Sequence, residues 1–466
     1  MSQKNETKIL ALALLLTVGI VSGGFWWFKN SGVKIGNTAT IPNQETGSNS
    51  SLQDRISFGE KSLMSGDISL VKKEGVEAIA TKSYDHAIAN FTAALKLNRN
   101  DPETLIFLNN ARIDSSKSYT IVVSVPLGTD PNAALEILRG IAQAQNQVNS
   151  SGGIKGVPLR VGIASDDDNP EIAKQIASSL VNNSEVLGVV GPNTSDSTLA
   201  AGTIYTSGQL VAISPTSTSV KISNFSRYVF RTVPSDFMAA RSLGNYMVKT
   251  LQKKNAVVFF NSQSNYSQSL KSEFVSSVSL EGGQVSSEFD LSKADFSAAK
   301  SLEQATKQGA EVLMLAANTE TLDKALQVVQ INQKRLTLLA GDDVYNAKTL
   351  EIGREQAVGM VLAVPWHIDG DPKSDFPQKS RQLWGADVSW RSALSYDATI
   401  ALIGALKITP TRFGVQQALT SSDFSATGAS GTIRFLASGD RNAPVQLVKI
   451  VPGSRSRTGY DFEPVH

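Results

Sequence analysis

From residue 119 onward, short apolar runs alternate with amphipathic segments. Residues 119–125, YTIVVSV, form a β-branched run that predicts a buried parallel strand. Residues 132–148 follow with apolar positions on one side, as expected of a helix packed on a sheet. The alternation continues through LRVGIA, VLGVV, LVAIS, AVVFF, VLMLA, LTLLA and GMVLAV. Strands alternating with helices predict parallel sheets with right-handed crossovers, and their number predicts an α/β fold of two Rossmann-like lobes.

Residues 55–115 show a helical pattern instead. Gly75, Ala87, Phe91 and Ala94 resemble the tetratricopeptide repeat at its expected offsets, although Arg99 replaces the usual proline. One such repeat cannot bury its own apolar face, so we expect this all-α segment to pack on a neighbouring domain or on a partner protein. A helical spacer and a protein-docking module both fit the pattern.

The N-terminal region contains an uncharged run over residues 9–28, long enough to cross a bilayer as a helix. Trp26 and Trp27 at its C-terminal end are typical of a membrane interface. We predict a transmembrane anchor over 1–29; the alternative is a cleaved signal peptide. Both predict an exported protein, periplasmic or extracytoplasmic, which an uncleaved helix would tether to the inner membrane. Residues 30–54 are rich in Ser, Thr, Asn and Gly, which is typical of a flexible linker.

Composition excludes several chemistries. The 466 residues carry a net charge of +2 with scattered Lys and Arg, which disfavours nucleic-acid binding. The chain has no cysteine, and its three histidines lie in no nucleophile-elbow or zinc pattern. No P-loop or G-x-G-x-x-G motif follows a predicted strand. We therefore expect no enzyme activity, no catalytic residue, no metal and no cofactor. The run 166–168, three aspartates, ends a strand without calcium-loop spacing, which favours a solvated strand end over a cation site.

Two loops rich in hydroxyl residues follow predicted strands. They are GPNTSDS (191–197) and SPTSTS (214–219). In open α/β sheets, ligands bind beyond the carboxyl ends of the strands, and a helix beginning near Ser195 would direct free N–H groups at an anionic group such as a carboxylate. Routine N-capping would explain one such loop, but two in the same setting favour a binding site.

Seven landmarks follow one another along the chain. They are GGIKG (152–156), VVGPNTSDST, ISPTSTS, VFRTVPSD (229–236), LAGDDVYN (339–346), SYDATIAL (395–402) and GTIRFLASGDR (431–441). In this order they resemble the type I periplasmic binding proteins, in the branch of the leucine/isoleucine/valine receptors of ABC importers.

The resemblance implies a binding domain over 118–466, with two α/β lobes joined by a three-segment hinge that closes on a ligand. It places lobe one at about 118–236 and 366–425, and lobe two at about 237–365 and 426–466.

The resemblance also implies site residues. Ser195, beside Thr194, matches the serine that binds a ligand carboxylate. Thr216 matches a backbone N–H donor to that carboxylate, and Thr218 matches a hydroxyl partner. Asp343 matches the acidic residue that binds the α-ammonium, with Asp342 as its exposed neighbour.

The side-chain pocket departs from the branched-chain receptors. Tyr266 is expected to line the cleft, and Asn318 falls near a position that is often aromatic in those receptors. Ala133 and Ala134 stand where an aromatic residue is common. These departures favour a small or polar amino acid.

The sequence therefore predicts an extracytoplasmic receptor that binds an amino acid or related solute between two lobes and delivers it to the membrane subunits of an ABC importer. The alternative is a ligand-sensing domain of a membrane-anchored signalling or scaffold protein. In that alternative, the helical segment transmits closure of the lobes to a protein partner.

Overall fold

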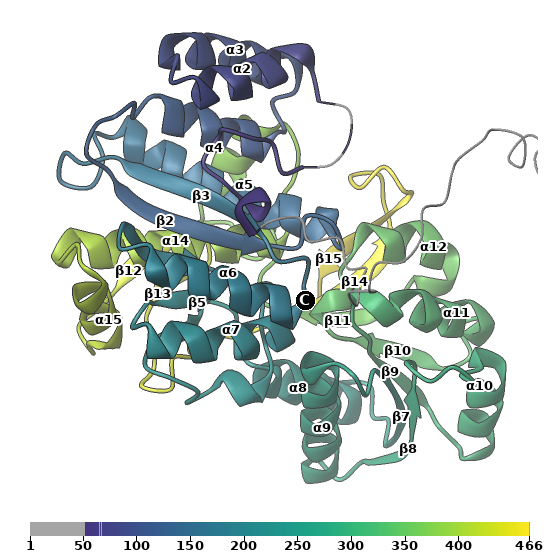
Figure 1. Cartoon of the computed structure of the whole chain (residues 1–466). Coiled ribbons are helices and arrows are strands. Elements are labelled where there is room, and N and C mark those ends of the chain that lie inside the picture. Colours follow the sequence, from purple (N-terminus) through teal and green to yellow (C-terminus); the bar gives the residue numbers. More distant parts are fainter. Residues whose placement is uncertain (1–51, 65, 67, 466) are drawn as a thin grey trace, which may run out of the picture. The chain divides into compact units, whose positions relative to one another are not determined.

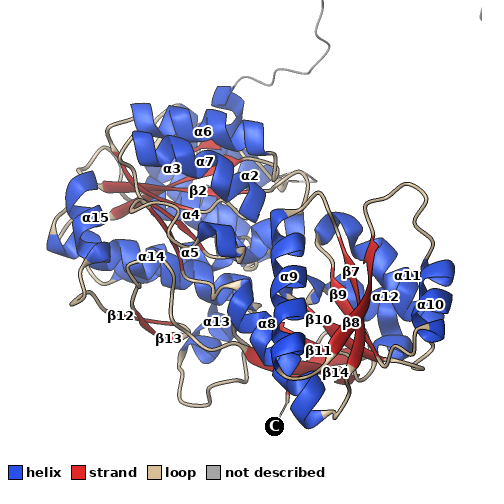
Figure 2. Cartoon of the chain, turned by 90° about the horizontal axis from the view of Figure 1, so that it is seen from below, coloured by secondary structure: helices blue, strands red, loops and turns tan. Residues whose placement is uncertain are grey.

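The computed structural model describes residues 52–64, 66 and 68–465, all within one compact unit over 50–466. The predicted anchor over 1–29 and most of the linker over 30–54 lie outside the described residues. Within the described residues, no helix combines the length and the apolar character that crossing a bilayer requires. The strands gather into two separate main sheets (Figures 1 and 2). The two-lobe α/β prediction is thus confirmed.

The first main sheet has six strands in the order β1-β3-β2-β4-β5-β6. All neighbours are parallel except β1, which runs antiparallel to β3. The strands are β1 (Ile56–Ser57), β2 (Tyr119–Val125), β3 (Leu159–Ser165), β4 (Val186–Val190), β5 (Ala212–Ser214) and β6 (Val229–Arg231). The helices of this lobe are α5 (Pro131–Ser150), α6 (Pro170–Asn182), α7 (Ser195–Ser207), α13 (Phe376–Trp384), α14 (Trp390–Ile408) and α15 (Arg412–Thr420).

The second main sheet has seven strands in the order β15-β14-β11-β10-β9-β7-β8. β14 and β15 are antiparallel additions to an otherwise parallel sheet. The strands are β7 (Asn255–Phe260), β8 (Gln284–Asp290), β9 (Val312–Ala316), β10 (Thr337–Ala340), β11 (Val361–Val364), β14 (Gln446–Pro452) and β15 (Tyr460–Pro464). Its helices are α8 (Asp236–Asn245), α9 (Asn265–Leu280), α10 (Ala298–Lys307), α11 (Leu322–Asn332) and α12 (Ala347–Ala357).

The chain passes between the two lobes three times: after β6, after β11 and before β14. Our expected boundary at residue 426 differs from the third crossing. β12 (Ala426–Gly428) and β13 (Gly431–Ile433) pair with each other and pack on α14 of lobe one. Arg441 connects them to lobe one: its Nη1 lies 2.7 Å from Asp397 Oδ2 of α14, and its Nη2 donates to the Thr432 carbonyl of β13 at 3.0 Å. The return to lobe two therefore comes between Arg441 and β14.

The segment before β2 forms three helices, α2 (Leu70–Ala80), α3 (Tyr84–Leu97) and α4 (Pro102–Ala111). α2 and α3 pack closely, because Gly75 leaves room for the ring of Phe91. Every residue of α4 is buried, and α4 packs on α5 of lobe one. The Asn110 side chain bonds the backbone of Val161 in β3 and the amide of Gln145 in α5. The expectation that this segment packs on a neighbour is met by lobe one.

An ion triad fixes the helical segment internally. Lys72 Nζ lies 2.8 Å from carboxylate oxygens of both Asp101 and Glu103. Glu103 is fully buried and also accepts hydrogen bonds from the Ser62 hydroxyl and the Leu63 N–H. Burial of a charge is tolerated here because every charged group has a partner.

Helices α5 and α14 of lobe one pack closely at Gly140. A Cβ atom at this position would lie 2.1 Å from the Ser392 carbonyl oxygen, a backbone atom that cannot move aside cheaply. Gly404, in α14 itself, has only ordinary contacts of 3.4 Å with the Phe424 ring around its would-be Cβ. Both glycines are helical, and they differ in the space available to a Cβ atom, so Gly404 is a suitable control for Gly140.

We expect Gly140→Ala to lower the free energy of unfolding by about 1–3 kcal/mol, because the helices must separate. Gly404→Ala should be neutral or stabilising by up to about 1 kcal/mol, since alanine favours a helix where space allows. Urea denaturation of both variants measures the difference. Equal stability of the two variants would contradict the close crossing.

Candidate functional site

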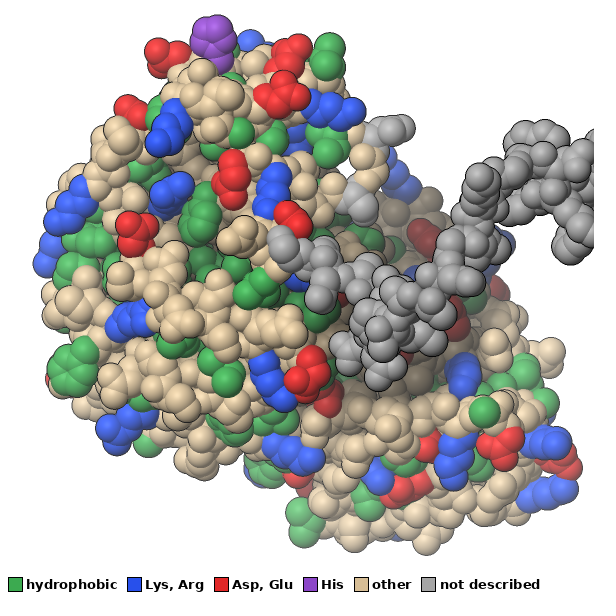
Figure 3. Space-filling view, in the orientation of Figure 1, with side chains coloured by type: hydrophobic (Ala, Val, Ile, Leu, Met, Phe, Trp, Pro, Cys, Tyr) green, Lys and Arg blue, Asp and Glu red, His purple; other side chains and the backbone are tan. Residues whose placement is uncertain are grey.

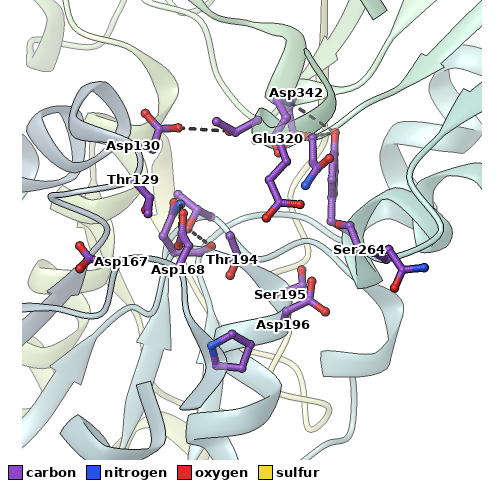
Figure 4. A pocket seen from close by; sticks show the side chains of 18 of the residues that line it. Thr129, Asp130, Asp167, Asp168, Thr194, Ser195, Asp196, Ser264, Glu320 and Asp342 are labelled. Carbon is purple, nitrogen blue, oxygen red and sulfur yellow. Dashed lines mark hydrogen bonds between the residues drawn. The ribbon is translucent and has the colours of Figure 1, made fainter. Parts of the chain in front are cut away.

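A cavity of about 490 Å³ lies between the lobes (Figure 4). Most of its lining comes from segments that follow the carboxyl ends of strands in both sheets, where ligands bind in open α/β folds, and Lys348 of α12 and Arg391 of α14 complete it. Lobe one contributes the loops after β2, β3, β4 and β5, and lobe two those after β7, β9 and β10. Of the seven predicted site residues, six line this cavity: Thr194, Ser195, Thr216, Tyr266, Asn318 and Asp343.

The first hydroxyl loop, 191–197, both caps helix α7 and lines the cavity. Thr194 is the N-cap of α7, and its hydroxyl accepts from the Ser197 N–H at 3.3 Å. Ser195 is only 1% exposed, and its Oγ accepts a hydrogen bond from the Ser219 N–H at 3.2 Å. Capping and lining, which we treated as alternatives, thus occur in one loop.

The second loop differs from expectation. The N–H of Thr216 is directed at Ser214 Oγ, 3.4 Å away, and its hydroxyl donates to the Asn193 carbonyl at 2.7 Å. Thr216 therefore fastens the two loops together. Thr218 is buried outside the cavity lining, beside Asp236, whose pKa burial raises to about 7. Its hydroxyl thus lies away from the place where we expected a ligand contact.

Across the cleft, the two aspartates after β10 differ from our expectation in which of them is buried. Asp342 is buried at 5% exposure, so the expectation that it is the exposed neighbour is wrong. The Tyr266 hydroxyl donates to its Oδ1 at 2.8 Å. Asp343 is the more open of the two, and its Oδ1 lies 2.9 Å from Nη2 of Arg391 in lobe one. Burial raises the pKa of Asp342 to about 6 and that of Asp343 to about 7.

The loop after β3 is organised and not merely solvated, contrary to our interpretation of the aspartate run. Asp166 is fully buried and accepts from the Ser124 hydroxyl at 2.6 Å. Asp167 and Asp168 adopt left-handed backbone conformations, with φ of 51° and 53°. Asp168 lines the cavity and accepts from the Asn193 amide at 3.1 Å.

Sequence reasoning also missed the contribution of Arg55. This residue lies at the start of the helical segment, before its first α-helix, yet its Nη1 is 2.7 Å from Asp167 Oδ2 at the cavity. The ion pair, with hydrogen bonds from Ser165 and Gly128, lowers the pKa of Asp167. The extension that precedes the two lobes therefore takes part in shaping the site.

Three carboxylates bridge the lobes around the cavity. Asp130, the N-cap of α5, accepts from the Thr319 hydroxyl at 3.1 Å. Asp196 accepts from the Asn265 N–H at 3.1 Å. The Asp343–Arg391 ion pair is the third. In each bridge a carboxylate belongs to one lobe and its donor to the other.

The wall near Asn318 is polar. Its Oδ1 accepts from the Asn261 amide at 3.0 Å and from the Thr321 hydroxyl at 2.8 Å. Tyr266 is the one aromatic side chain of the described lining. Among the described residues, no cluster of His, Cys, Asp and Glu has the geometry of a metal site. The arrangement suits reversible binding of a small polar molecule.

Comparison with known proteins decides the family. A sequence model described as "Periplasmic binding protein" matches residues 119–455. The chain belongs to the periplasmic binding protein family. Its helical segment lies before the matched region of this periplasmic binding protein.

Curated relatives match parts of the chain. An "Amino acid binding protein" of Pseudomonas aeruginosa is 29% identical over 144 residues, 31% of this chain and 38% of the relative. A "Leucine-specific-binding protein" of Salmonella typhimurium is 26% identical over 238 residues, 50% of this chain and 63% of the relative. The matches thus span about 38% to 63% of these relatives' lengths.

Solved structures show the same fold. An ABC transporter substrate-binding protein from Desulfitobacterium hafniense, in complex with Leu, is 22% identical with a TM-score of 0.64, covering 75% of this chain and all of that one. The substrate-binding protein from Sphaerobacter thermophilus is 18% identical with a TM-score of 0.66, covering 75% of this chain and 97% of that one. The two-lobe architecture of this periplasmic binding protein is therefore shared.

The buried aspartates predict how stability varies with pH. Because the folded-state pKa values of Asp342 and Asp343 exceed the usual value near 4, the folded protein binds more protons than the unfolded chain between pH 4 and 7. The free energy of unfolding of the ligand-free protein should therefore fall as pH rises through this window. Asp343→Asn should make that fall shallower, by at most about 1.4 kcal/mol per pH unit.

Urea denaturation at several pH values between 4.5 and 7.5 checks this expectation. Asp290→Asn is the matched control, because hydrogen bonds lower the pKa of Asp290 to about 2, below the window. An unchanged slope in Asp343→Asn would contradict the assignment.

Proposed function

We propose that this periplasmic binding protein is an extracytoplasmic receptor that captures an amino acid or a related small solute and delivers it to an ABC importer. The observation that carries the proposal is the pairing, across one cavity, of the α7 N-terminus at Ser195 with carboxylates at the end of β10. An α-amino acid has a carboxylate for the first and an ammonium for the second. The amino-acid-binding relatives support the same assignment.

Closure of the lobes is the second element of the proposal. The three crossings provide the hinge, and the three polar bridges provide contacts that form only when the lobes approach. A ligand touching both lobes would favour the closed state by its extra contacts there.

Ser195→Ala is the direct test of the carboxylate end. It should weaken binding of an α-amino acid about tenfold, because a buried hydroxyl donor is lost. The matched control is Ser207→Ala at the exposed C-terminal end of the same helix, which should bind as the unchanged protein does. Calorimetry against a panel of the amino acids measures both variants. Failure of every amino acid and related amine to bind would refute the receptor function.

The sensing alternative and the tetratricopeptide resemblance of 55–115 stay predictions. Since α4 is buried against α5, any partner bound by the helical segment would be attached to lobe one. Loss of solute uptake when the gene is deleted supports transport. Retained uptake, with recovery of a signalling protein on the full-length chain, supports sensing.

A further inference from the structure

The cavity has a strong excess of negative charge. Two cationic side chains line it, Lys348 and Arg391. Seven carboxylates line it: Asp130, Asp167, Asp168, Asp196, Glu320, Asp342 and Asp343. The excess is local, because the whole chain has a net charge of +2, and both signs are scattered over the face seen in Figure 3.

Most of this charge has no counter-charge within the described part of the chain. Arg55 pairs with Asp167, and Arg391 pairs with Asp343. Lys348 Nζ lies 2.6 Å from Asp323, outside the lining. The other carboxylates make no ion pair with a described cation: Asp130, Asp168, Asp196, Glu320 and Asp342.

These carboxylates belong to both lobes and repel one another across the cleft. Burial raises the pKa of Asp168, and so do the charges of its neighbour Asp166, of Asp130 in lobe one and of Asp343 in lobe two. Glu320 extends into the cavity from lobe two, opposite Asp130 and Asp168 (Figure 4). Closure therefore becomes more favourable when positive charge enters between the lobes.

Few apolar side chains line the cavity. Pro170 and Tyr266 are the less polar members of the described lining, which contains no Val, Leu, Ile, Met or Phe. An aliphatic side chain placed here would remove water from the carboxylates. It would offer them neither a hydrogen-bond donor nor a counter-charge in return. One α-ammonium near Asp343 would also leave the group around Asp130, Asp168 and Glu320 without a counter-charge.

We propose that the ligand is an organic dication, a molecule with two ammonium or guanidinium groups joined by a short aliphatic chain. One cationic group lies at Asp342 and Asp343, and the other at Asp130, Asp168 and Glu320. This inference rests on the proposed receptor function and names the class of its ligand. The volume of about 490 Å³ lies within the usual range for small-molecule sites.

Two classes of organic dication fit this description, basic α-amino acids and simple diamines. The side of the cavity at Ser195 distinguishes them, because only an amino acid has a carboxylate to place there. Ser195 is almost fully buried, lines the cavity and accepts from Ser219, yet its hydroxyl donates to no described residue. That free donor at the α7 N-terminus fits a ligand carboxylate. The geometry therefore favours a basic α-amino acid.

Pairs of ligands that differ by one charge test the proposal by calorimetry on the full chain. Arginine should bind at least about a hundredfold tighter than citrulline, its neutral isostere, and lysine similarly tighter than norleucine. Cadaverine is lysine without the carboxylate: weaker binding of cadaverine identifies an amino acid, and equal or tighter binding identifies a diamine. Citrulline or norleucine binding as tightly as its charged counterpart overturns the dication but leaves the receptor function intact. No binding by any of these, or by the wider amino-acid panel, overturns both.

Glu320→Gln tests where the second cationic group of the ligand binds. Glu320 is exposed at the cavity, and its one described hydrogen bond is a long one of 3.5 Å from Asn261, so the variant should fold normally. It should reduce the arginine-to-citrulline affinity ratio about tenfold. Glu77→Gln, at an exposed position of α2 outside the cavity, is the matched control and should leave the ratio unchanged. An unchanged ratio in Glu320→Gln overturns the assignment of this position.

Discussion

Repulsion between carboxylates on opposite sides of one cavity is the constraint on which this site depends. Parallel strands end at the same edge of a sheet, so two α/β lobes that face each other present two sets of strand-end loops to one space. Here both sets carry aspartates. Each lining carboxylate that has a described cationic partner obtains it from a distant part of the chain: Asp343 from α14 and Asp167 from Arg55, before α2. The other five carboxylates of the lining make no ion pair with a described cation, so a cationic ligand would relieve the repulsion between them.

Much of the architecture could be predicted from the sequence. The alternation of apolar runs and amphipathic segments predicted two parallel α/β lobes, because burial on both faces of a sheet leaves uninterrupted β-branched runs. The hydroxyl loops after β4 and β5 were recognised for the same reason: they come directly after such runs. Their ligand role stays a prediction, although six of the seven proposed residues line one cavity.

The errors have a common physical origin in contacts between residues far apart in sequence. Which member of the pair Asp342 and Asp343 is buried depends on the Tyr266 hydroxyl, 76 residues away. The run 166–168 appeared solvated because charged residues usually are, yet Ser124 and Arg55 provide partners that no local pattern reveals. The lobe boundary near 426 was misplaced because the buried Arg441–Asp397 pair, and not local propensity, attaches β12 and β13 to lobe one.

The segment before β2 also protects an edge of the lobe-one sheet. β1 consists of two residues, Ile56 and Ser57, which pair antiparallel with β3. β3 would otherwise be the outermost strand of its sheet, with unpaired N–H and C=O groups that invite pairing with another molecule. β1 covers part of that edge and is too short to offer a good template itself. Resistance of lobe one to edge-to-edge aggregation thus depends on residues outside the region, 119–455, that defines the family.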